Sequence, residues 1–360
     1  MLIPTPKDFT PKGEVLADTQ DMKPEEFSEM KQKYSRMGYF SASQSPALLG
    51  VYSSATQVFE EMRQEQPKDL SQSKSWDKIV FGRLIENWIG NYASEMIEVD
   101  VFNDPYMLGN KQHSWICCNK DFHLVENDTY PGRWAMETKS TSNWQVRKEL
   151  GVSGSEHTVA QYYIQMQHQM FVDELDGCIN PVLIIKDPST LPMAIDAITG
   201  GETVEYVMSD VPHYMNWYVV KRDEEFISEL RDHLIRMREI FHQGGQPPTD
   251  GSDATSKVLR NKERSGGMAL ADEETMEMID KIKIKKDQIK TEQESIKEIE
   301  NSLLSKLGEH EGYQYEGNPV MSVKQVNSTR FNSTQFKKEH PELAKEYNQL
   351  STYTKVEYNA

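Results

Sequence analysis

The sequence predicts an α/β protein with a charged helical extension at its C-terminal end, and three features support this. A short apolar stretch, Trp134 to Met136, is typical of a buried strand and ends in the charged tripeptide Glu137-Thr138-Lys139. Segments with helical periodicity alternate with segments rich in β-branched and aromatic residues up to residue 243. A Gly/Pro-rich stretch then leads into a highly charged helical tract at 270–308.

Composition indicates a soluble protein with exposed, extended parts. Hydrophobic residues make up 37% of the 360 residues and charged residues 27%. No apolar run approaches the roughly 20 residues that span a bilayer, and the first residues lack the pattern of a signal peptide, so we expect no membrane association. Three cysteines cannot form a disulfide framework. We therefore expect a reduced, cytoplasmic protein.

The net charge of −17 argues against a non-specific nucleic-acid coat, which is normally basic. It does not exclude a nuclease, because metal-binding carboxylates add negative charge and a local basic patch can meet DNA on an acidic body. Composition alone leaves the function open.

Four segments follow from the distribution of proline, glycine and charge. We expect a flexible leader at 1–23, a folded domain at 24–243, a linker at 244–268 and a helical extension with a short strand at 269–360.

The elements of the folded domain are predicted in order from the spacing of apolar residues. Phe27, Met30 and Tyr34 lie on one face of the first helix, and each later helix has a similar apolar face. Strands are predicted where β-branched and aromatic residues cluster between turn residues. We expect helices at 24–37, 56–64, 81–93, 159–172 and 226–241, and strands at 115–126, 134–139, 180–186 and 202–208.

The extension is predicted from one heptad position and from its charge. Ile282, Ile289, Ile296 and Leu303 recur every seven residues, but no second position of the heptad is consistently apolar. A helix packed on its own chain or on a partner therefore fits better than a long coiled coil. A strand at 320–326 and a short helix at 336–347 follow.

The tripeptide that ends the 134–139 strand carries the main chemical hypothesis. Because side chains alternate along a strand, Glu137 and Lys139 project from one side and Thr138 from the other. A carboxylate can hold a hard divalent cation while a lysine orients water or offsets charge on a phosphate. Taken alone, such a pair is more often a solvated surface pair.

Three further residues are candidates for binding phosphate or metal, on weaker sequence signals. Serines at 41, 43 and 45 indicate a helix start, where exposed N–H groups and Arg36 can bind a phosphate together with Ser43. An ordinary N-cap beside a surface arginine is the more common explanation. Glu86, at the margin of an apolar helix face, is a metal ligand or a solvated carboxylate.

The remaining candidates come from a hairpin and a helix. The strands at 115–126 and 134–139 are expected to pair, which brings Asp121 near Glu137. Tyr162, Gln165 and Gln169 share one helical face, whose glutamines either hydrogen-bond a nucleic-acid backbone or a metal-bound water or lie in solvent. Together the carboxylates can hold Mg²⁺ or Mn²⁺ with positions left for water and phosphate. The sequence has no G-x-x-x-x-G-K-[ST], no H-E-x-x-H and no zinc-type cysteine pair to compete.

The ordered set resembles the YqaJ-like viral recombinase family, which includes the bacteriophage lambda exonuclease and belongs to the PD-(D/E)xK nucleases. The resemblance covers roughly residues 30–245, and the tail from Ser333 to Tyr358 is similar to the extension of that group. It rests on Arg36-Met-Gly-Tyr-Phe-Ser-Ala-Ser43, Phe81-Gly-Arg-Leu-Ile-Glu86, Asp121, Glu137-Thr138-Lys139, Tyr162-Tyr-Ile-Gln165-Met-Gln167 and Lys221-Arg-Asp-Glu224.

The resemblance implies a PD-(D/E)xK restriction-endonuclease-like core, a mixed central sheet flanked by helices, and a role for each matched residue. Asp121 and Glu137 would bind the metal with the backbone carbonyl of Thr138, and Glu86 would assist. Lys139 would position the water, and Gln165 and Tyr162 would support the site. Arg36 and Ser43 would contact a DNA phosphate.

The family digests linear duplex DNA 5′→3′, works beside a single-strand annealing protein, and has members that form ring-shaped trimers. The chain departs from the family where it has Lys120-Asp121-Phe122 in place of the usual Pro-Asp-Gly. We therefore expect a metal-dependent DNA exonuclease, with a related DNA endonuclease or a non-catalytic DNA-binding or assembly factor as the alternatives.

Overall fold

The computed structural model describes residues 1–20, 22, 24–64, 76–262, 264, 266–329, 331–347, 354 and 356. The chain divides into two compact units, Met1–Leu259 and Arg260–Ala360. Within the described residues, no helix combines the length and apolar character needed to cross a membrane. A polar connection is expected between the helices at 56–64 and 81–93, and residues 65–75 of it lie outside the described residues.

The first unit alternates helices and short strands along most of its length. Its elements in chain order are β1 (Glu14–Asp18), α1 (Pro24–Arg36), β2 (Phe40–Ser41), η1 (Ala42–Gln44), α2 (Ser45–Leu48), α3 (Ala55–Arg63), α4 (Trp76–Met96), β3 (Val101–Asn103), β4 (Tyr106–Gly109), β5 (Ile116–Cys118), β6 (Phe122–Leu124), β7 (Trp134–Met136), β8 (Lys139–Thr141), α5 (Trp144–Glu149), α6 (Ala160–Asp173), β9 (Gly177–Ile185), η3 (Pro188–Thr190), α7 (Leu191–Thr199), α8 (Val204–Asp210), β10 (His213–Lys221) and α9 (Glu224–His242). Helix α10 (Asp253–Asn261) follows.

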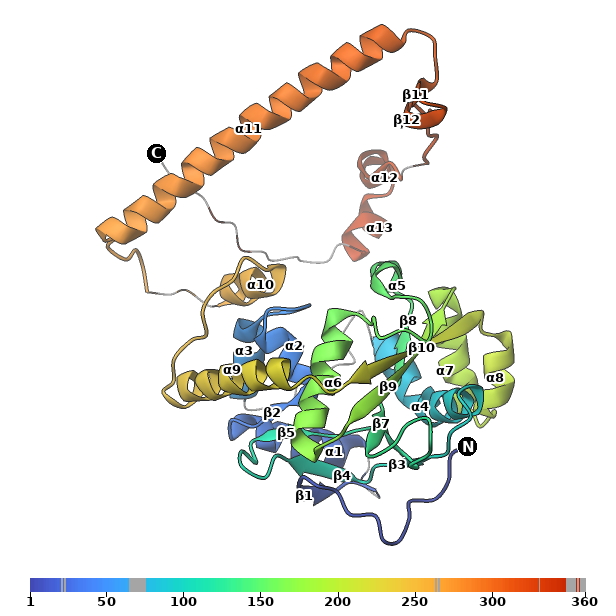
Figure 1. The fold of residues 1–360 in the computed structure, drawn as a ribbon. Helices are drawn as coiled ribbons and strands as arrows, with labels where there is room; N and C mark the ends of the chain where they lie inside the picture. Colours follow the sequence, from blue (N-terminus) through green and yellow to red (C-terminus); the bar gives the residue numbers. More distant parts are fainter. Residues whose placement is uncertain are drawn as a thin grey trace. The chain divides into compact units, whose positions relative to one another are not determined.

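The larger sheet is mixed and has the strand order β10-β9-β7-β6-β3, with β8 also paired to β9 (Figure 1). Strand β9 runs parallel to β7 and β8 and antiparallel to β10. Alternate residues of β9 face different helices, because Val182 packs in a cluster with α6 and Leu183 in a cluster with α4. A mixed sheet flanked by helices is the fold class that the sequence predicted, and the prediction is confirmed.

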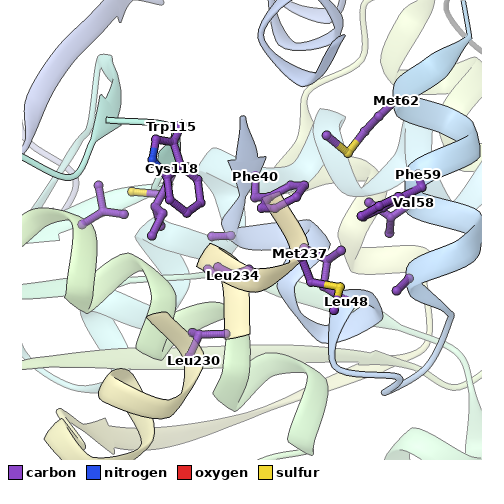
Figure 2. Packing of buried hydrophobic residues seen from close by; sticks show 14 of the residues in the cluster. Phe40, Leu48, Val58, Phe59, Met62, Trp115, Cys118, Leu230, Leu234 and Met237 are labelled. Carbon is purple, nitrogen blue, oxygen red and sulfur yellow. The ribbon is translucent and has the colours of Figure 1, made fainter. Parts of the chain in front are cut away.

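A smaller sheet and the N-terminal helices enclose a second apolar core. Its strand order is β1-β4-β5-β2. Figure 2 shows Phe40 of β2 and Phe59 of α3 packed near Leu234 of α9, all fully buried. Trp115 and Phe40 meet edge to face at 6.1 Å between ring centroids. This core fixes the segment 40–48, which carries the predicted Ser43, against α9.

The expectation of a flexible leader at 1–23 is wrong for the described part of that segment. Strand β1 pairs antiparallel with β4, and Ile3 donates a backbone hydrogen bond to Val101 at 2.8 Å. Prolines 4, 6 and 11 lack N–H groups, but an extended chain can still pair along the edge of a sheet through the residues between them.

Two predicted strands differ from the structure. The segment 115–126 forms two strands in two different sheets, β5 and β6, which are separated by Asn119–Asp121. The segment 202–208 is mostly helix α8, because the hydroxyl of Thr203 accepts from the N–H of Tyr206 and the helix buries Val207 and Met208. Tertiary burial overrides the strand preference of β-branched residues here. The sequence analysis did not predict β10.

The second unit contains one long helix and several short elements. Its elements are α11 (Glu273–Leu307), β11 (Gly312–Tyr315), β12 (Asn318–Ser322), α12 (Ser333–Glu339) and α13 (Pro341–Glu346). The helix predicted at 336–347 is two helices, since His340 precedes Pro341 and the residue before a proline disfavours helical backbone. The predicted linker at 244–268 contains α10.

Candidate active site

The candidate site forms where the ladder between β7 and β9 is interrupted. Met136 pairs with Ile179 and Lys139 with Val182 in the same parallel register, so Thr138 falls opposite Pro181. Pro181 has no N–H to donate, and the carbonyl of Glu137 instead accepts from the side-chain amide of Asn180 at 2.8 Å. The proline thus separates β7 from β8 at Glu137 and Thr138.

Glu137 is buried and is held by three side chains. Its Oε1 accepts from Lys139 Nζ at 2.6 Å and from Gln165 Nε2, and its Oε2 accepts from Gln169 Nε2 at 2.7 Å. Both glutamines come from α6 and share the one helical face that the sequence predicted for them. The pairing of Glu137 with Lys139 also agrees with the predicted alternation along the strand.

Asp121 lies on the other side of the interruption, just ahead of β6. Its Oδ2 accepts from both the backbone N–H and the hydroxyl of Thr138, each at 2.8 Å. Strands β6 and β7 pair antiparallel, which is the hairpin that the sequence predicted for these residues. The contacts of Thr138 to Asp121 are through its nitrogen and hydroxyl, and the role expected for its carbonyl stays a prediction.

Glu86 of α4 completes the acidic group. It lines a cavity of about 400 Å³ together with Asp121, Glu137 and Gln165. Glu86 is partly buried, and within the described part of the chain its carboxylate makes no hydrogen bond or ion pair. The ligand oxygens of Glu86, Asp121 and Glu137 do not all lie within 4.8 Å of one another.

The pKa directions record the repulsion among these carboxylates. Burial raises the pKa of Asp121 well above its ordinary value, and the charges of Glu137 and Glu86 raise it further. Burial and Glu137 likewise raise the pKa of Glu86. Burial alone would lower the pKa of Lys139, but the carboxylates of Glu137 and Asp121 outweigh it and raise that pKa. An added positive charge would therefore stabilise the ionised carboxylates of the site.

Two cations that the sequence analysis missed border the cavity. Lys31 of α1 and Arg83 of α4 line it with the carboxylates. Lys31 Nζ lies 5.2 Å from the ring centroid of Phe27, and its pKa is lowered by burial and, to a smaller extent, by the charges of Arg83 and Lys139. The spacing of Phe27 and Lys31, one helical turn apart, was the available signal.

Of the two predicted phosphate-binding residues, the structure brings only one to the cavity. Ser43 lines it and lies 3.1 Å from Ser41 between hydroxyl oxygens. Arg36 is exposed in the last turn of α1 and is not among the residues that line this cavity. The expected helix start is real but short, because η1 and α2 together span only Ala42 to Leu48.

Tyr162 contributes a ring beside the catalytic candidate Lys139. The Lys139 ammonium lies 5.8 Å from the centroid of the Tyr162 ring. Tyr162 is 9% exposed and also lines a neighbouring pocket with Ser140, Thr141 and Gln161. A pocket with hydroxyl groups thus adjoins the site on the side of α6.

A second buried charge cluster lies next to the site and has a different composition. Lys120 Nζ lies 2.7 Å from Asp104 Oδ2 and 3.4 Å from Asp173 Oδ2, and His123 Nε2 lies 3.0 Å from the same Asp104 oxygen. Arg133 also reaches Asp173 at 3.0 Å. Asp104, His123 and Asp173 have the spacing of a metal site. The Lys120 ammonium already lies among them, however, and two cations balance the two carboxylates, so we interpret the cluster as structural.

The departure from the usual Pro-Asp-Gly therefore has a packing explanation. Lys120 enters this buried cluster, and Phe122 is fully buried in the core formed with α4. Gly90 of α4 makes room for the ring, since a Cβ added there would lie 2.5 Å from Phe122 Cζ. Asp121, between them, remains at the cavity.

Part of the chain matches the model of a known family. Residues 31–176 match the profile of the YqaJ-like viral recombinase domain. This stretch contains Ser43, Glu86, Asp121, Glu137, Lys139 and Gln165, and the resemblance to this family that the sequence predicted is confirmed for residues 31–176.

Several solved structures are similar to this chain. An alkaline exonuclease from Laribacter hongkongensis has 11% sequence identity and a TM-score of 0.38, covering 60% of this chain and 93% of its own. Its complex with dAMP has the same identity and coverage and a TM-score of 0.41. A phage-related exonuclease from Haemophilus somnus 129PT has 12% identity and a TM-score of 0.34, covering 58% of this chain and 96% of its own. No relative was found among curated proteins.

Proposed function

We propose that this protein is a divalent-metal-dependent DNA exonuclease that digests linear duplex DNA in the 5′→3′ direction in phage-type recombination. The observation that carries the proposal is the group of Glu86, Asp121, Glu137 and Lys139 around one cavity at the interruption of the sheet. The YqaJ-like viral recombinase domain supports the choice of DNA as the substrate.

The donor set fits Mg²⁺ or Mn²⁺. Glu86, Asp121 and Glu137 would hold the ion, with the backbone carbonyl of Thr138 as a further ligand. The pKa values of Asp121 and Glu86 are raised, and the Glu86 carboxylate has no partner among the described residues; both support a cation at this place. When bound, the ion supplies Lewis-acid polarisation of the phosphate and lowers the pKa of water.

The protein's own residues would do the remaining work. Lys139 would hold the attacking water, whose oxygen forms the new bond to phosphorus as the bond to the leaving oxygen breaks. Gln165 and Gln169 would fix the orientation of Glu137 through the hydrogen bonds described above. Lys31, Arg83 and Ser43 would bind the phosphates at the mouth of the cavity. Tyr162 would limit the movement of the Lys139 side chain.

Two elements of this proposal depend on the family alone. They are a single-strand annealing protein as a partner and a ring-shaped trimer as an assembly. A pull-down of the full chain with a candidate annealing protein, and the mass of the free protein, would test them separately.

The direct test uses three duplex DNA substrates of one sequence with Mg²⁺. They are a linear form with 5′-phosphate ends, a linear form with 5′-hydroxyl ends and a closed circle. We expect loss of the linear forms only, faster with the 5′-phosphate. Cutting of the circle would favour the endonuclease. Absence of cleavage with either Mg²⁺ or Mn²⁺, while DNA still binds, would favour the non-catalytic DNA-binding factor.

A further inference from the structure

The pocket beside Tyr162, which residues 140–143 line, has no role in the cleavage chemistry described above. We call it the β8 pocket, because β8 and the residues just after it form one of its walls. Apolar side chains of α4, β9 and α7 form another part of the lining. Its volume is about 360 Å³, which lies within the range of roughly 300–1,000 Å³ that small-ligand sites occupy.

The β8 pocket and the catalytic cavity follow each other along the same three elements. On α6, Tyr162 lines the pocket and Gln165, about one turn later, lines the cavity, and α4 shows the same order. Glu137 lines the cavity, and residues 140–143 line the pocket. Ser142 follows Lys139 by three residues, which is roughly 10 Å of extended chain. One DNA strand advances about 3.4 Å per nucleotide along its axis, so a strand bound at Lys139 reaches Ser142 within a few nucleotides.

The hydroxyl of Ser142 is a buried polar group that lacks a partner. Ser142 lines the pocket, and its buried Oγ makes no hydrogen bond within the described part of the chain. The adjacent Thr141 hydroxyl, by contrast, accepts from the N–H of Asn143 at 3.1 Å. A buried hydroxyl without a partner costs free energy, and a ligand oxygen that accepts from it would remove that cost.

The charge of the lining suits a phosphate. Among the described residues that line the β8 pocket, Lys78 is the one cation and none is a carboxylate. Asp77 is exposed beside Lys78 but does not line the pocket. The catalytic cavity has several carboxylates in its lining, and the whole chain has a net charge of −17. A phosphate therefore meets less repulsion in the β8 pocket than in a metal-free catalytic cavity.

Tyr52 gives the β8 pocket an exposed aromatic ring. It lies between α2 and α3, lines the pocket, and exposes 83% of its surface. Its φ of 70° lies in the left-handed region, which an aromatic residue rarely adopts. Strained backbone of this kind is concentrated at functional sites. An exposed tyrosine ring can stack on a nucleobase of any sequence.

We propose that the β8 pocket binds the strand that remains after cleavage, at its nucleotide next to the cleaved bond. Ser142 and Lys78 bind the phosphate on the 3′ side of that nucleotide, and the Tyr52 ring stacks on its base. This inference rests on the proposed function and adds to it a site for the retained strand. Contacts to a phosphate and to the face of a base carry no sequence preference, as digestion of any DNA requires.

A neutral linkage at one position tests the phosphate contact. A linear duplex with a methylphosphonate between its second and third nucleotides, counted from the 5′ end, is compared with the unmodified duplex and with a duplex modified on the opposite strand. Binding to the full chain is measured by fluorescence anisotropy with Ca²⁺ in place of Mg²⁺. We expect the neutral linkage on the digested strand to raise Kd about tenfold, as for one lost hydrogen bond to a charged group. The linkage on the opposite strand should leave Kd nearly unchanged.

Variants of the lining assign that loss to the β8 pocket. In the double variant Ser142→Ala, Lys78→Met, Kd for the unmodified duplex should rise about tenfold, and the neutral linkage should raise it no further. The Ser142 hydroxyl has no partner in the free protein, so Ser142→Ala should leave Tm unchanged. Lys111→Met is the control for charge, because Lys111 is exposed and lines neither the pocket nor the catalytic cavity. A neutral linkage that costs as much in the double variant as in the wild type, or more on the opposite strand, would overturn the proposal.

The stacking contact is tested with two Tyr52 variants and a duplex whose second nucleotide is abasic. Tyr52→Ala should raise Kd about tenfold, whereas Tyr52→Phe keeps the ring and should not. The abasic nucleotide should weaken binding to the wild type and not to Tyr52→Ala. Equal affinities of the Ala and Phe variants would overturn the role of the ring.

Cleavage measured in parallel with Mg²⁺ or Mn²⁺ separates the pocket from the proposed function. Loss of affinity at the second linkage without cleavage of any DNA would support the pocket and overturn the nuclease. Digestion of linear DNA with equal KM for the wild type and the double variant would support the nuclease and overturn the pocket. Absence of binding to every duplex would overturn both.

Discussion

Two buried groups of charges lie side by side in this protein, and adjacent residues belong to different groups. Lys120 belongs to a closed cluster in which its ammonium and the Arg133 guanidinium balance Asp104 and Asp173. Asp121 belongs to an open cluster in which three carboxylates face one cavity. The side chains of Lys120 and Asp104 are fully buried, whereas Glu86 and Asp121 are only partly so.

The difference separates charges that stabilise the fold from charges that are available for chemistry. In the closed cluster, burial alone would raise the pKa of Asp104, but Lys120 and His123 outweigh it and lower that pKa. In the open cluster, burial and neighbouring carboxylates raise the pKa of Asp121, so its charged form destabilises the folded state at neutral pH. An unbalanced buried charge of this kind is typical of functional sites.

The largest expected effect is on the open cluster. Lys139→Ala should lower the rate of linear DNA digestion about a thousandfold, because it removes the ammonium that orients water beside Glu137. Lys221→Ala is the control, since Lys221 is exposed and pairs only with Glu156 among the ion pairs of the described residues. Initial rates on 5′-phosphorylated duplex DNA, with circular dichroism to check the fold, measure the effect. Equal rates for the two variants would refute the role of Lys139.

Single substitutions of the adjacent residues Lys120 and Asp121 should separate an effect on stability from an effect on activity. Lys120→Met should lower the free energy of unfolding by about 3–5 kcal/mol, because Asp104 and Asp173 would lose a buried cation. Asp121→Asn should not lower it, and should raise it at neutral pH, since the neutral amide removes the repulsion that raises the Asp121 pKa.

Urea unfolding of both variants, with digestion rates measured in parallel, tests this contrast. Asp121→Asn should lose cleavage while keeping stability, and Lys120→Met should lose stability. Equal loss of stability in the two variants would mean that both clusters serve the fold.

Phe122, the residue after Asp121, leads to a prediction about Gly90 in which the change in the free energy of unfolding is smaller and has the opposite sign to the usual one. Gly→Ala inside a helix ordinarily stabilises by about 1 kcal/mol. Gly90→Ala should instead destabilise by roughly 1–3 kcal/mol, because the new Cβ would meet Phe122. The double variant Gly90→Ala, Phe122→Leu should recover part of the loss in thermal unfolding. Additive losses in the double variant would show that the two positions are not in contact.

The smallest expected effect is a change in KM, which distinguishes Lys31 from Arg36 as the residue that binds the DNA phosphate. Lys31→Met should raise KM for 5′-phosphorylated DNA about tenfold, as expected for loss of one hydrogen bond to a charged group, with kcat less affected. Arg36→Met should change KM by less than twofold, roughly as a rim charge does. A larger effect at Arg36 would restore the prediction made from the sequence pattern.

The sequence determined the features that depend on local periodicity. The two-residue repeat of a strand put Glu137 and Lys139 on one side, and the helical repeat put Gln165 and Gln169 on one face. The distance along the chain between Asp121 and Glu137 is short, so a hairpin could be expected to bring them together. The apolar heptad position of Ile282, Ile289, Ile296 and Leu303 is likewise visible in the sequence.

Only the tertiary structure decided which charges meet across long distances in the chain. Nothing local indicates that Lys120 reaches Asp173, or that Pro181 interrupts the ladder opposite Thr138. The segment 202–208 has strand formers but becomes helix α8, because its burial against α4 and α7 outweighs a weak local preference. Lys31 reaches the cavity in preference to Arg36 for the same reason: the packing of α1 on the domain, which periodicity does not encode, sets which of its cations faces the carboxylates.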